Sequence, residues 1–264
     1  MKLSIRHQTH YKFDAPSGFA LQRLQLCPVN SNSQKVHSWN IEIEGAVKQL
    51  EYINAFGNHN QLNKIDTDST EVIISVEGEV ETYDIAGVDS SDTNFPMWIY
   101  LQSTPATKVG KGLRVICNQY KANSDTLLVF HEIMGRLRSE VPYEIGATDV
   151  TTTAEESWAI RKGVCQDHSH LMIAVARELG FPARYVSGYL LMDGIVDQSA
   201  THAWCEVYIQ DLGWVGFDVS NGISPDERYV KIATGRDYSD AAPVMGIRYG
   251  DAKETLDVHL QIQQ

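Results

Sequence analysis

The stretch Gly163-Val164-Cys165-Gln166-Asp167-His168-Ser169-His170-Leu171 decides how the second half of this 264-residue chain is expected to fold. Gly163 is typical of a helix end, and the apolar spacing after it predicts a new helix from Cys165 to Gly180. A thiol at a helix N-terminus meets roughly +0.5 charge and free N–H groups, which favour the nucleophilic thiolate. A lone cysteine is more commonly a small buried apolar residue. Cys165 is therefore a candidate nucleophile that needs partners.

Two strands downstream carry the candidate partners. Alternating apolar residues predict strands over 201–209 and 214–217, after another over 183–191. His202 begins the first of these and Asp218 follows the last. A histidine here can be a general base or a packed ring, and an aspartate at a strand end is most often a turn residue. Taken together, the order Cys, His, Asp favours a catalytic set.

The turn between these strands tests that hypothesis. A tight turn centred between Asp211 and Leu212 would place Asp218 opposite Cys205, on the face away from His202. The three side chains meet only if a longer loop or a bulge shifts the register. Gly213 can supply the positive φ that such a connection needs.

Several stretches together resemble the transglutaminase-like superfamily, in its bacterial branch. They are residues 163–171 around Cys165, 181–189 (Phe-Pro-Ala-Arg-Tyr-Val-Ser-Gly-Tyr), 201–208 (Thr-His-Ala-Trp-Cys-Glu-Val-Tyr), 213–218 (Gly-Trp-Val-Gly-Phe-Asp) and 235–238 (Gly-Arg-Asp-Tyr). Near the N-terminus, Thr9–Phe13 and Leu24–Pro28 resemble the β domain of that branch. The resemblance spans nearly the whole chain.

This resemblance implies an α+β protein, with a papain-like or transglutaminase-like core preceded by an antiparallel β-sandwich domain. It implies a triad of Cys165 as nucleophile, His202 as base and Asp218 as the residue that orients the base, with no cofactor. The family places a second oxyanion donor upstream of the cysteine, a tryptophan in animal transglutaminases. No tryptophan lies between Trp98 and Trp158, so this donor is unassigned and the Cys165 backbone N–H is the candidate.

The pattern divides the chain into a β domain over 1–83, a linker over 84–96 and a catalytic domain over 97–264. Alternating apolar residues predict short strands before residue 80, and the linker is polar and rich in Gly, Ser and Asp. Ser124 or Asp125 can cap a helix that runs to about residue 140, and Thr153 with Glu156 fits a capping box. The tail after residue 221 is predicted to be mostly loop, with one strand near 256–262.

Composition limits the partners and the location. Lys and Arg total 22 against 34 Asp and Glu, a net charge of −12, which disfavours nucleic acid and anionic membranes. There is no run of 18 apolar residues and no signal-like N-terminus, so a cytoplasmic protein is expected. The cysteines Cys27, Cys117, Cys165 and Cys205 are too scattered for a disulfide framework or zinc pairs.

A metal site is the weaker hypothesis for Asp167, His168 and His170, because no strong zinc pattern is present. We expect hydrogen bonding and packing beside Cys165 from these histidines, and an ion pair between Arg236 and Asp237 beneath the site. Trp158, Trp204 and Trp214 are expected in the core.

The sequence therefore predicts a cysteine-dependent acyl-transfer enzyme that hydrolyses amide or peptide bonds through a thioester. The expected partner is a peptide or protein amide substrate. Transglutaminase-type amine transfer, a non-catalytic scaffold and a metal-dependent hydrolase are the competing hypotheses. Hydrolysis is favoured over amine transfer because the upstream tryptophan is not evident and the loops are short. The β domain either positions substrate or mediates homo-oligomerisation, and both roles are compatible with the sequence.

Overall fold

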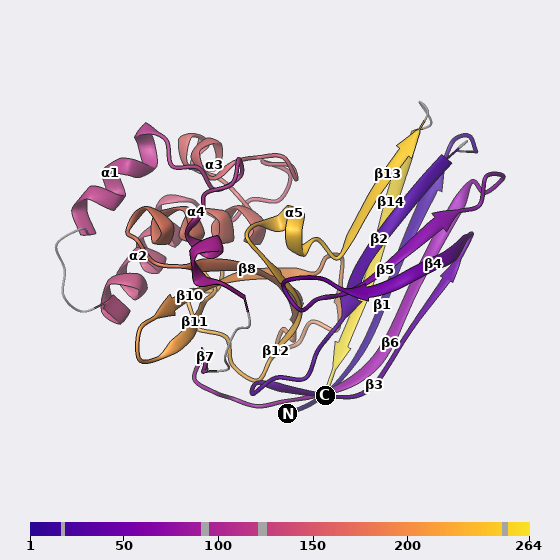
Figure 1. The fold of residues 1–264 in the computed structure, drawn as a ribbon, viewed down its shortest axis with the longest axis horizontal. Helices are drawn as coiled ribbons and strands as arrows, with labels where there is room; N and C mark the ends of the chain where they lie inside the picture. Colours follow the sequence, from indigo (N-terminus) through magenta and orange to yellow (C-terminus); the bar gives the residue numbers. More distant parts are fainter. Residues whose placement is uncertain (17–18, 91–94, 121–125, 250–252) are drawn as a thin grey trace.

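The computed structural model describes residues 1–16, 19–90, 95–120, 126–249 and 253–264. It has a β-sandwich at one side and a helix-covered sheet at the other, with both chain termini at the same end of the sandwich (Figure 1). The mixed α and β architecture that the sequence predicts is confirmed. Within the described residues, no helix is both long and apolar enough to cross a membrane.

Two antiparallel sheets form the sandwich. The first has the strand order β3-β6-β1-β14-β9 and the second the order β13-β2-β5-β4. The bounds are β1 Lys2–Phe13, β2 Phe19–Cys27, β3 Gln34–Glu44, β4 Ala46–Ile53, β5 His59–Ile65, β6 Glu71–Thr82, β9 Asp197–Gln198, β13 Val244–Tyr249 and β14 Glu254–Gln263. Strand β1 alternates exposed and buried residues, because one face packs inside the sandwich.

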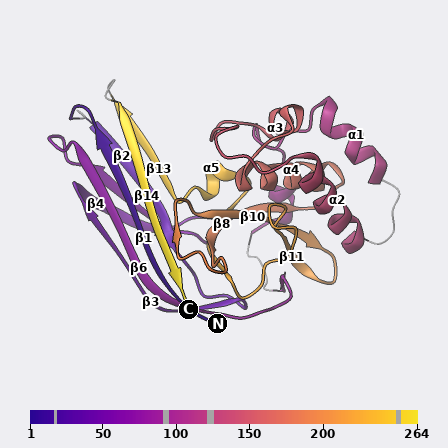
Figure 2. The ribbon, with the colours of Figure 1, turned by 180° about the vertical axis from the view of Figure 1, so that it is seen from behind.

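The second half is a sheet of order β12-β8-β10-β11-β7 with helices packed against it (Figure 2). The bounds are β7 Val88–Asp89, β8 Ala183–Leu190, β10 His202–Ile209, β11 Gly213–Phe217 and β12 Tyr229–Gly235. The helices are η1 Met97–Leu101, α1 Lys111–Tyr120, α2 Thr126–Glu140, α3 Ala154–Ile160, α4 Cys165–Glu178 and α5 Tyr238–Ala241. Helix α4 is the centre of this half, with every residue from Asp167 to Arg177 buried.

Buried polar contacts fix α4 and the start of α3. The guanidinium of Arg177 donates to the carbonyls of Tyr100 and Ala183 at 2.8 Å and of Arg236 at 2.7 Å. The predicted capping box is confirmed, because Thr153 and Glu156 cap α3 reciprocally. The other predicted cap, Ser124 or Asp125, lies outside the described residues.

The predicted domain boundaries are wrong at two places. The chain after residue 243 returns to the sandwich, where β13 pairs with β2 and β14 pairs with β1 from Ser4 opposite Gln263 to Phe13 opposite Glu254. Within the predicted linker, β7 pairs with β11. Both errors have one cause: alternation identifies a strand, but its partner comes from a distant part of the chain.

The two halves share buried surface. Tyr189 and Val230 of the second half belong to the apolar core of the sandwich, together with Leu3 and Ile5. The amide of Asn58 in the sandwich donates to the Thr234 carbonyl at 2.8 Å and accepts from its N–H at 2.9 Å. These contacts fix one half against the other.

Candidate active site

Helix α4 begins at Cys165, as predicted, and its first turn is fixed by side chains. The Asp167 carboxylate accepts hydrogen bonds from the Val164 N–H at 2.8 Å and from the Thr148 hydroxyl at 2.7 Å. The Ser169 hydroxyl donates to the Cys165 carbonyl at 2.8 Å. Cys165 is half-buried, so its thiol lies at a fixed helix N-terminus and is still open to a substrate.

The loop between β10 and β11 shifts the register as the candidate triad requires. Ile209 pairs with Gly213 and Cys205 with Phe217, which leaves a three-residue loop rather than a two-residue turn. Asp211 and Gly213 have φ of 69° and 98°, so this loop uses positive φ where a glycine is favoured. Asp218 follows Phe217 and therefore falls on the face of the sheet that carries His202. The predicted register shift is confirmed.

His202 and Asp218 meet in a buried hydrogen bond. The distance between His202 Nε2 and Asp218 Oδ2 is 2.7 Å. The same carboxylate oxygen also accepts from the Asn221 amide and from the Tyr229 hydroxyl, each at 2.7 Å, and Oδ1 accepts from the Asn221 N–H at 3.2 Å. Four donors thus hold a fully buried carboxylate in one orientation.

These contacts determine the charge on the imidazole. Burial alone would lower the pKa of His202, but the hydrogen bonds to Asp218 and Cys165, with the charges on those groups, outweigh burial and raise the pKa to about 10. Burial would raise the pKa of Asp218, yet His202, Asn221 and Tyr229 lower it. The arrangement therefore favours an imidazolium beside an anionic Asp218.

The thiol of Cys165 completes the line of three groups. It lies close enough to the His202 side chain to help raise the pKa of that imidazole, whose Nε2 is already engaged by Asp218. This leaves Nδ1 as the ring nitrogen that faces the thiol. A proton can therefore move between Cys165 and His202 while Asp218 holds the ring, which is the arrangement of a cysteine nucleophile with an oriented base.

Tyr143 is a residue of this site that the sequence pattern did not reveal. Partial burial of its hydroxyl and the charge of the neighbouring Cys165 raise the pKa of Tyr143 to about 12. A β-bridge to Gly163 holds its backbone beside the start of α4. The sequence left the second oxyanion donor unassigned, and Tyr143 supplies a phenol hydroxyl beside Cys165. The signal that could have found it is its position directly after Pro142, which ends the preceding helix region.

The two histidines that follow Cys165 have hydrogen-bonding roles. His168 Nε2 lies 2.7 Å from the Val141 carbonyl and its Nδ1 lies 2.9 Å from the Ser220 hydroxyl, so both ring nitrogens are occupied. His170 Nε2 accepts the Tyr238 N–H at 3.1 Å, and burial lowers the pKa of His170 to about 4. Among the described residues, no group of three metal-ligating side chains is found.

The expected ion pair between Arg236 and Asp237 is wrong. Arg236 pairs with Asp240 at 2.7 Å, and Asp237 instead caps α5 by accepting the Ser239 N–H at 2.9 Å. An aspartate directly before a short helix satisfies free N–H groups, which explains the difference. The three tryptophans Trp158, Trp204 and Trp214 are buried, as predicted.

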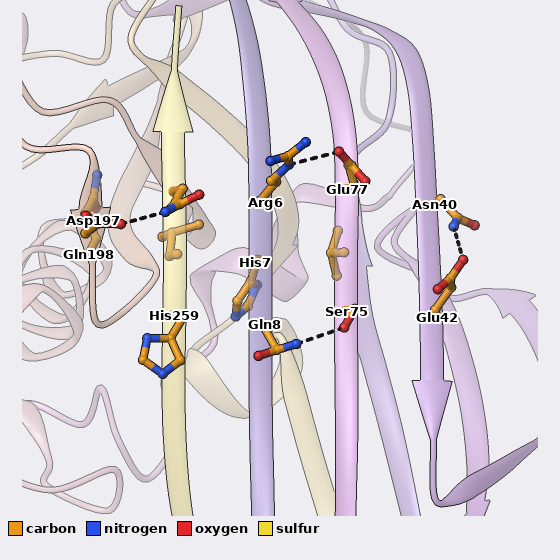
Figure 3. Close-up of a pocket in the computed structure, with 13 residues that line it drawn as sticks. Arg6, His7, Gln8, Asn40, Glu42, Ser75, Glu77, Asp197, Gln198 and His259 are labelled. Atoms are coloured by element: carbon orange, nitrogen blue, oxygen red, sulfur yellow. Dashed lines mark hydrogen bonds and ion pairs between the residues drawn. The ribbon is translucent and has the colours of Figure 1, made fainter.

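A cavity of about 450 Å³ lies elsewhere, against the outer face of the first sandwich sheet (Figure 3). Its polar side chains pair with one another: Arg6 with Glu77 at 2.9 Å, Asn40 with Glu42 at 2.9 Å, and Gln261 with Asp197 at 2.8 Å (Figure 3). Cys165, His202 and Asp218 do not line it. The candidate chemistry is therefore at the start of α4 and not in this cavity.

Comparison with known proteins agrees with this fold. Residues 116–219 match the transglutaminase-like superfamily, and residues 3–81 match the bacterial transglutaminase-like N-terminal region. The crystal structure of a candidate cysteine protease from Cytophaga hutchinsonii superimposes with a TM-score of 0.82 at 24% identity, covering 100% of this chain and 90% of that one. At that identity the likeness concerns the fold.

Two relatives show how far the sequence similarity extends. An uncharacterised protein of Mycobacterium leprae is 28% identical over 281 residues, covering 99% of this chain and 98% of its own length. A protein-glutamine gamma-glutamyltransferase of Pseudomonas aeruginosa is 33% identical over 100 residues, which is 34% of this chain and 15% of that protein.

The fold and the site define a transglutaminase-like core, and residues 116–219 of the chain match that superfamily. More particularly, it joins this core to the N-terminal region of the bacterial branch.

Proposed function

We propose that the chain is a cysteine-dependent acyl-transfer enzyme that hydrolyses amide or peptide bonds through a Cys165–His202–Asp218 triad. The observation that carries the proposal is the arrangement of the three side chains. The half-buried thiol of Cys165 neighbours the imidazole of His202, which is hydrogen-bonded to the buried carboxylate of Asp218. The raised pKa of His202 supports a protonated imidazole beside Cys165 at neutral pH.

In the first step the Cys165 thiolate attacks the carbonyl carbon of the amide. The oxyanion forms between the Cys165 N–H and the hydroxyl of the neighbouring Tyr143. His202 then gives its proton to the leaving amine, the C–N bond breaks, and a thioester remains on Cys165. A water molecule deprotonated by His202 attacks the thioester, and the acid leaves.

Hydrolysis is favoured over amine transfer because the site is open. Cys165 is half-buried and Tyr143 is exposed, so water reaches the thioester. An enzyme that transfers amines must exclude water, which is present at about 55 M. The similarity of part of this core to a protein-glutamine gamma-glutamyltransferase keeps amine transfer as the second candidate.

The test is a library of peptide amides incubated with the wild-type protein and with Cys165→Ala. Mass spectrometry follows the acid product, and a millimolar primary amine is added to a parallel series. We expect acid that depends on Cys165, with little amide product when the amine is present. Predominant amine incorporation would establish the second candidate instead, and product formed equally by Cys165→Ala would refute the triad.

Two further measurements distinguish this enzyme from a non-catalytic scaffold and from a metal-dependent hydrolase. We expect iodoacetamide to label Cys165 faster than Cys117 and Cys205, which are buried. Uniformly slow labelling of all four cysteines would favour the scaffold. Loss of activity in the presence of a chelator would favour the metal-dependent hydrolase.

A further inference from the structure

Strand β12 contacts both the candidate triad and the sandwich. It lies at the edge of its sheet, next to β8, and six of its seven residues are buried. Successive residues of a strand point to opposite faces of the sheet. On β12, Tyr229 packs with Trp204 near the triad, whereas the next residue, Val230, belongs to the apolar core of the sandwich. One strand therefore joins the two parts of the molecule.

On the triad side, the Tyr229 hydroxyl donates to Asp218 Oδ2 at 2.7 Å. The Asn221 amide donates to the same oxygen, but Asn221 belongs to the turn that Asp218 begins, in which the Gly222 N–H donates to the Asp218 carbonyl at 2.7 Å. Asn221 therefore cannot fix that turn against the sheet, whereas Tyr229 comes from another strand and can. Burial and the charge of Asp218 raise the pKa of Tyr229, so its hydroxyl keeps its proton and remains a donor.

The ring of Tyr229 also packs among the rings around His202. The centroid of the Trp204 ring lies 5.3 Å from that of Tyr229 and 6.4 Å from that of His202, which it faces at 25°. Gly188 leaves room for the indole, because it pairs with His202 and a Cβ there would lie 2.6 Å from the Trp204 ring. Trp204 and Tyr229 are both buried. They keep water from this side of the hydrogen bond between His202 and Asp218, which strengthens that bond.

On the sandwich side, two buried amides hold the backbone of β12. The Gln34 side chain, on β3, donates to the Lys231 carbonyl and accepts from the Lys231 N–H, both at 2.8 Å. The Asn58 side chain makes the same reciprocal pair with Thr234, at 2.8 and 2.9 Å. Gln34 and Asn58 are 1% and 2% exposed, so water does not compete for these bonds. The sandwich therefore fixes the strand that carries Tyr229.

We propose that the sandwich positions the triad through β12, with Tyr229 as the positioning residue. Gln34 and Asn58 hold the strand against the sandwich. The Tyr229 hydroxyl then holds the Asp218 carboxylate, and with it the imidazole beside Cys165. This inference rests on the proposed function, because it concerns the same triad. It gives the sandwich a part in the reaction that does not require it to bind the substrate.

Two conservative variants cut the two ends of this connection. Tyr229→Phe removes the hydroxyl that holds Asp218 and keeps the ring that packs against Trp204. Gln34→Leu removes the amide that holds the Lys231 backbone and keeps a side chain of similar length. The double variant tests whether the two ends act through one path.

Each variant has a matched control. Tyr208→Phe is the control for the tyrosine, because Tyr208 lies on the same strand as His202 but packs against Trp214, with ring centroids 5.5 Å apart. Gln22→Leu is the control for the glutamine. Gln22 is also buried in the sandwich, at 3% exposure, but it pairs with β13 and β5 and not with β12.

Steady-state kinetics on a peptide that the wild type hydrolyses give the first readout. Tyr229→Phe should lower kcat by about 10-fold to 100-fold, a loss typical of removing a group that orients a functional side chain. KM should stay unchanged, because Tyr229 acts through Asp218 and not on the substrate. Gln34→Leu should lower kcat by about tenfold, since a small misplacement of reacting groups is costly. The double variant should lose no more than Tyr229→Phe, because both changes break the same connection.

An NMR measurement separates this inference from the proposed function, because it needs no peptide. The proton between His202 Nε2 and Asp218 should give a downfield resonance that exchanges slowly with water in the wild type. Tyr229→Phe and Gln34→Leu should speed this exchange, while both controls should leave it unchanged. If the wild type hydrolysed no peptide, the proposed hydrolysis would fail, and the exchange rates would still decide whether the sandwich positions the triad.

Three results would overturn the inference. The first is a wild-type exchange rate in Tyr229→Phe. The second is a double variant whose loss of kcat equals the product of the two single losses, because the sandwich would then act by another route. The third is an equal effect of Gln22→Leu and Gln34→Leu, which would indicate a general loss of stability. If Gln34→Leu does not fold, Asn58→Leu takes its place with the same expected results.

Discussion

Two buried histidines, one in each half of the molecule, show what distinguishes the candidate site from the rest of the fold. His7 in the sandwich is 4% exposed and His202 is 7% exposed. Burial lowers the pKa of His7 to about 4, whereas the pKa of His202 is raised to about 10. Equal burial therefore gives opposite charge states at neutral pH.

The partners explain the difference. His7 Nδ1 lies 3.0 Å from the Tyr189 hydroxyl and its Nε2 lies 3.0 Å from the Thr9 hydroxyl, both of which are neutral groups. His202 has the Asp218 carboxylate at 2.7 Å and the Cys165 thiol on its other side. The neutral ring of His7 joins the two halves of the molecule, while the charged ring of His202 can stabilise a thiolate. The chemistry thus depends on one carboxylate and one thiol rather than on burial.

The largest expected effect follows from removing the carboxylate charge. Asp218→Asn should lower kcat/KM for a peptide substrate by up to about 10⁴-fold, the loss seen for the same change in a serine-protease triad. It should also lower the pKa of His202, because burial then acts without the neighbouring charge. Steady-state kinetics and an NMR titration of His202 measure the two effects.

Asp257→Asn is the control for this change, since Asp257 is exposed on β14. It should retain wild-type turnover. If Asp218→Asn also retained wild-type turnover, Asp218 would not be part of the machinery.

The contrast between His202 and His7 also shows what the sequence can predict. Helix α4 and the strands that carry His202 and Asp218 have local signals, namely a glycine stop and alternating apolar residues. Strand β12 has no such signal, because six of its seven residues are buried and alternation disappears. Tyr229 on that strand was therefore missed, although its hydroxyl holds Asp218.

Long-range contacts were equally hidden. The pairing of β14 with β1 joins the two ends of the chain, and His7 meets Tyr189 across 182 positions. Tyr143 reaches Cys165 through a bridge to Gly163 that no periodicity predicts. By contrast, helix α1 could have been found, because Leu113, Ile116 and Cys117 have the spacing of one buried helix face.

A smaller effect is expected at the oxyanion. Tyr143→Phe removes one hydroxyl beside Cys165 and should lower kcat by about 10²-fold with little change in KM, because the donor acts on charge that develops in the transition state. Kinetics on the same peptide measure both constants. Tyr52→Phe, an exposed tyrosine on β4, is the control and should change neither constant. An unchanged kcat in Tyr143→Phe would leave the Cys165 N–H as the donor supported by the structure.

The smallest effect concerns stability, and it separates the two histidines by the direction of its pH dependence. His7 has a lowered pKa when folded, so between about pH 4 and 6.5 the unfolded chain binds more protons. Its contribution to the free energy of unfolding is complete above pH 6.5 and falls by about 3 kcal/mol as the pH drops through 4. His202 has a raised pKa, so its contribution is complete below pH 6.5 and is lost as the pH rises towards about 10.

Urea unfolding from pH 4 to 10 tests both directions with three variants. His7→Gln keeps a polar group between Tyr189 and Thr9 but does not titrate, so its stability should fall less than that of the wild type below pH 6.5. Asp218→Asn should lack the decline above pH 6.5, while His259→Gln, an exposed change on β14, should parallel the wild type throughout. If the wild type and His7→Gln lost stability in parallel below pH 6.5, the charge state of His7 would not differ between the folded and unfolded chain. The contrast between a neutral ring at the domain contact and a charged ring at the thiol would then have to be abandoned.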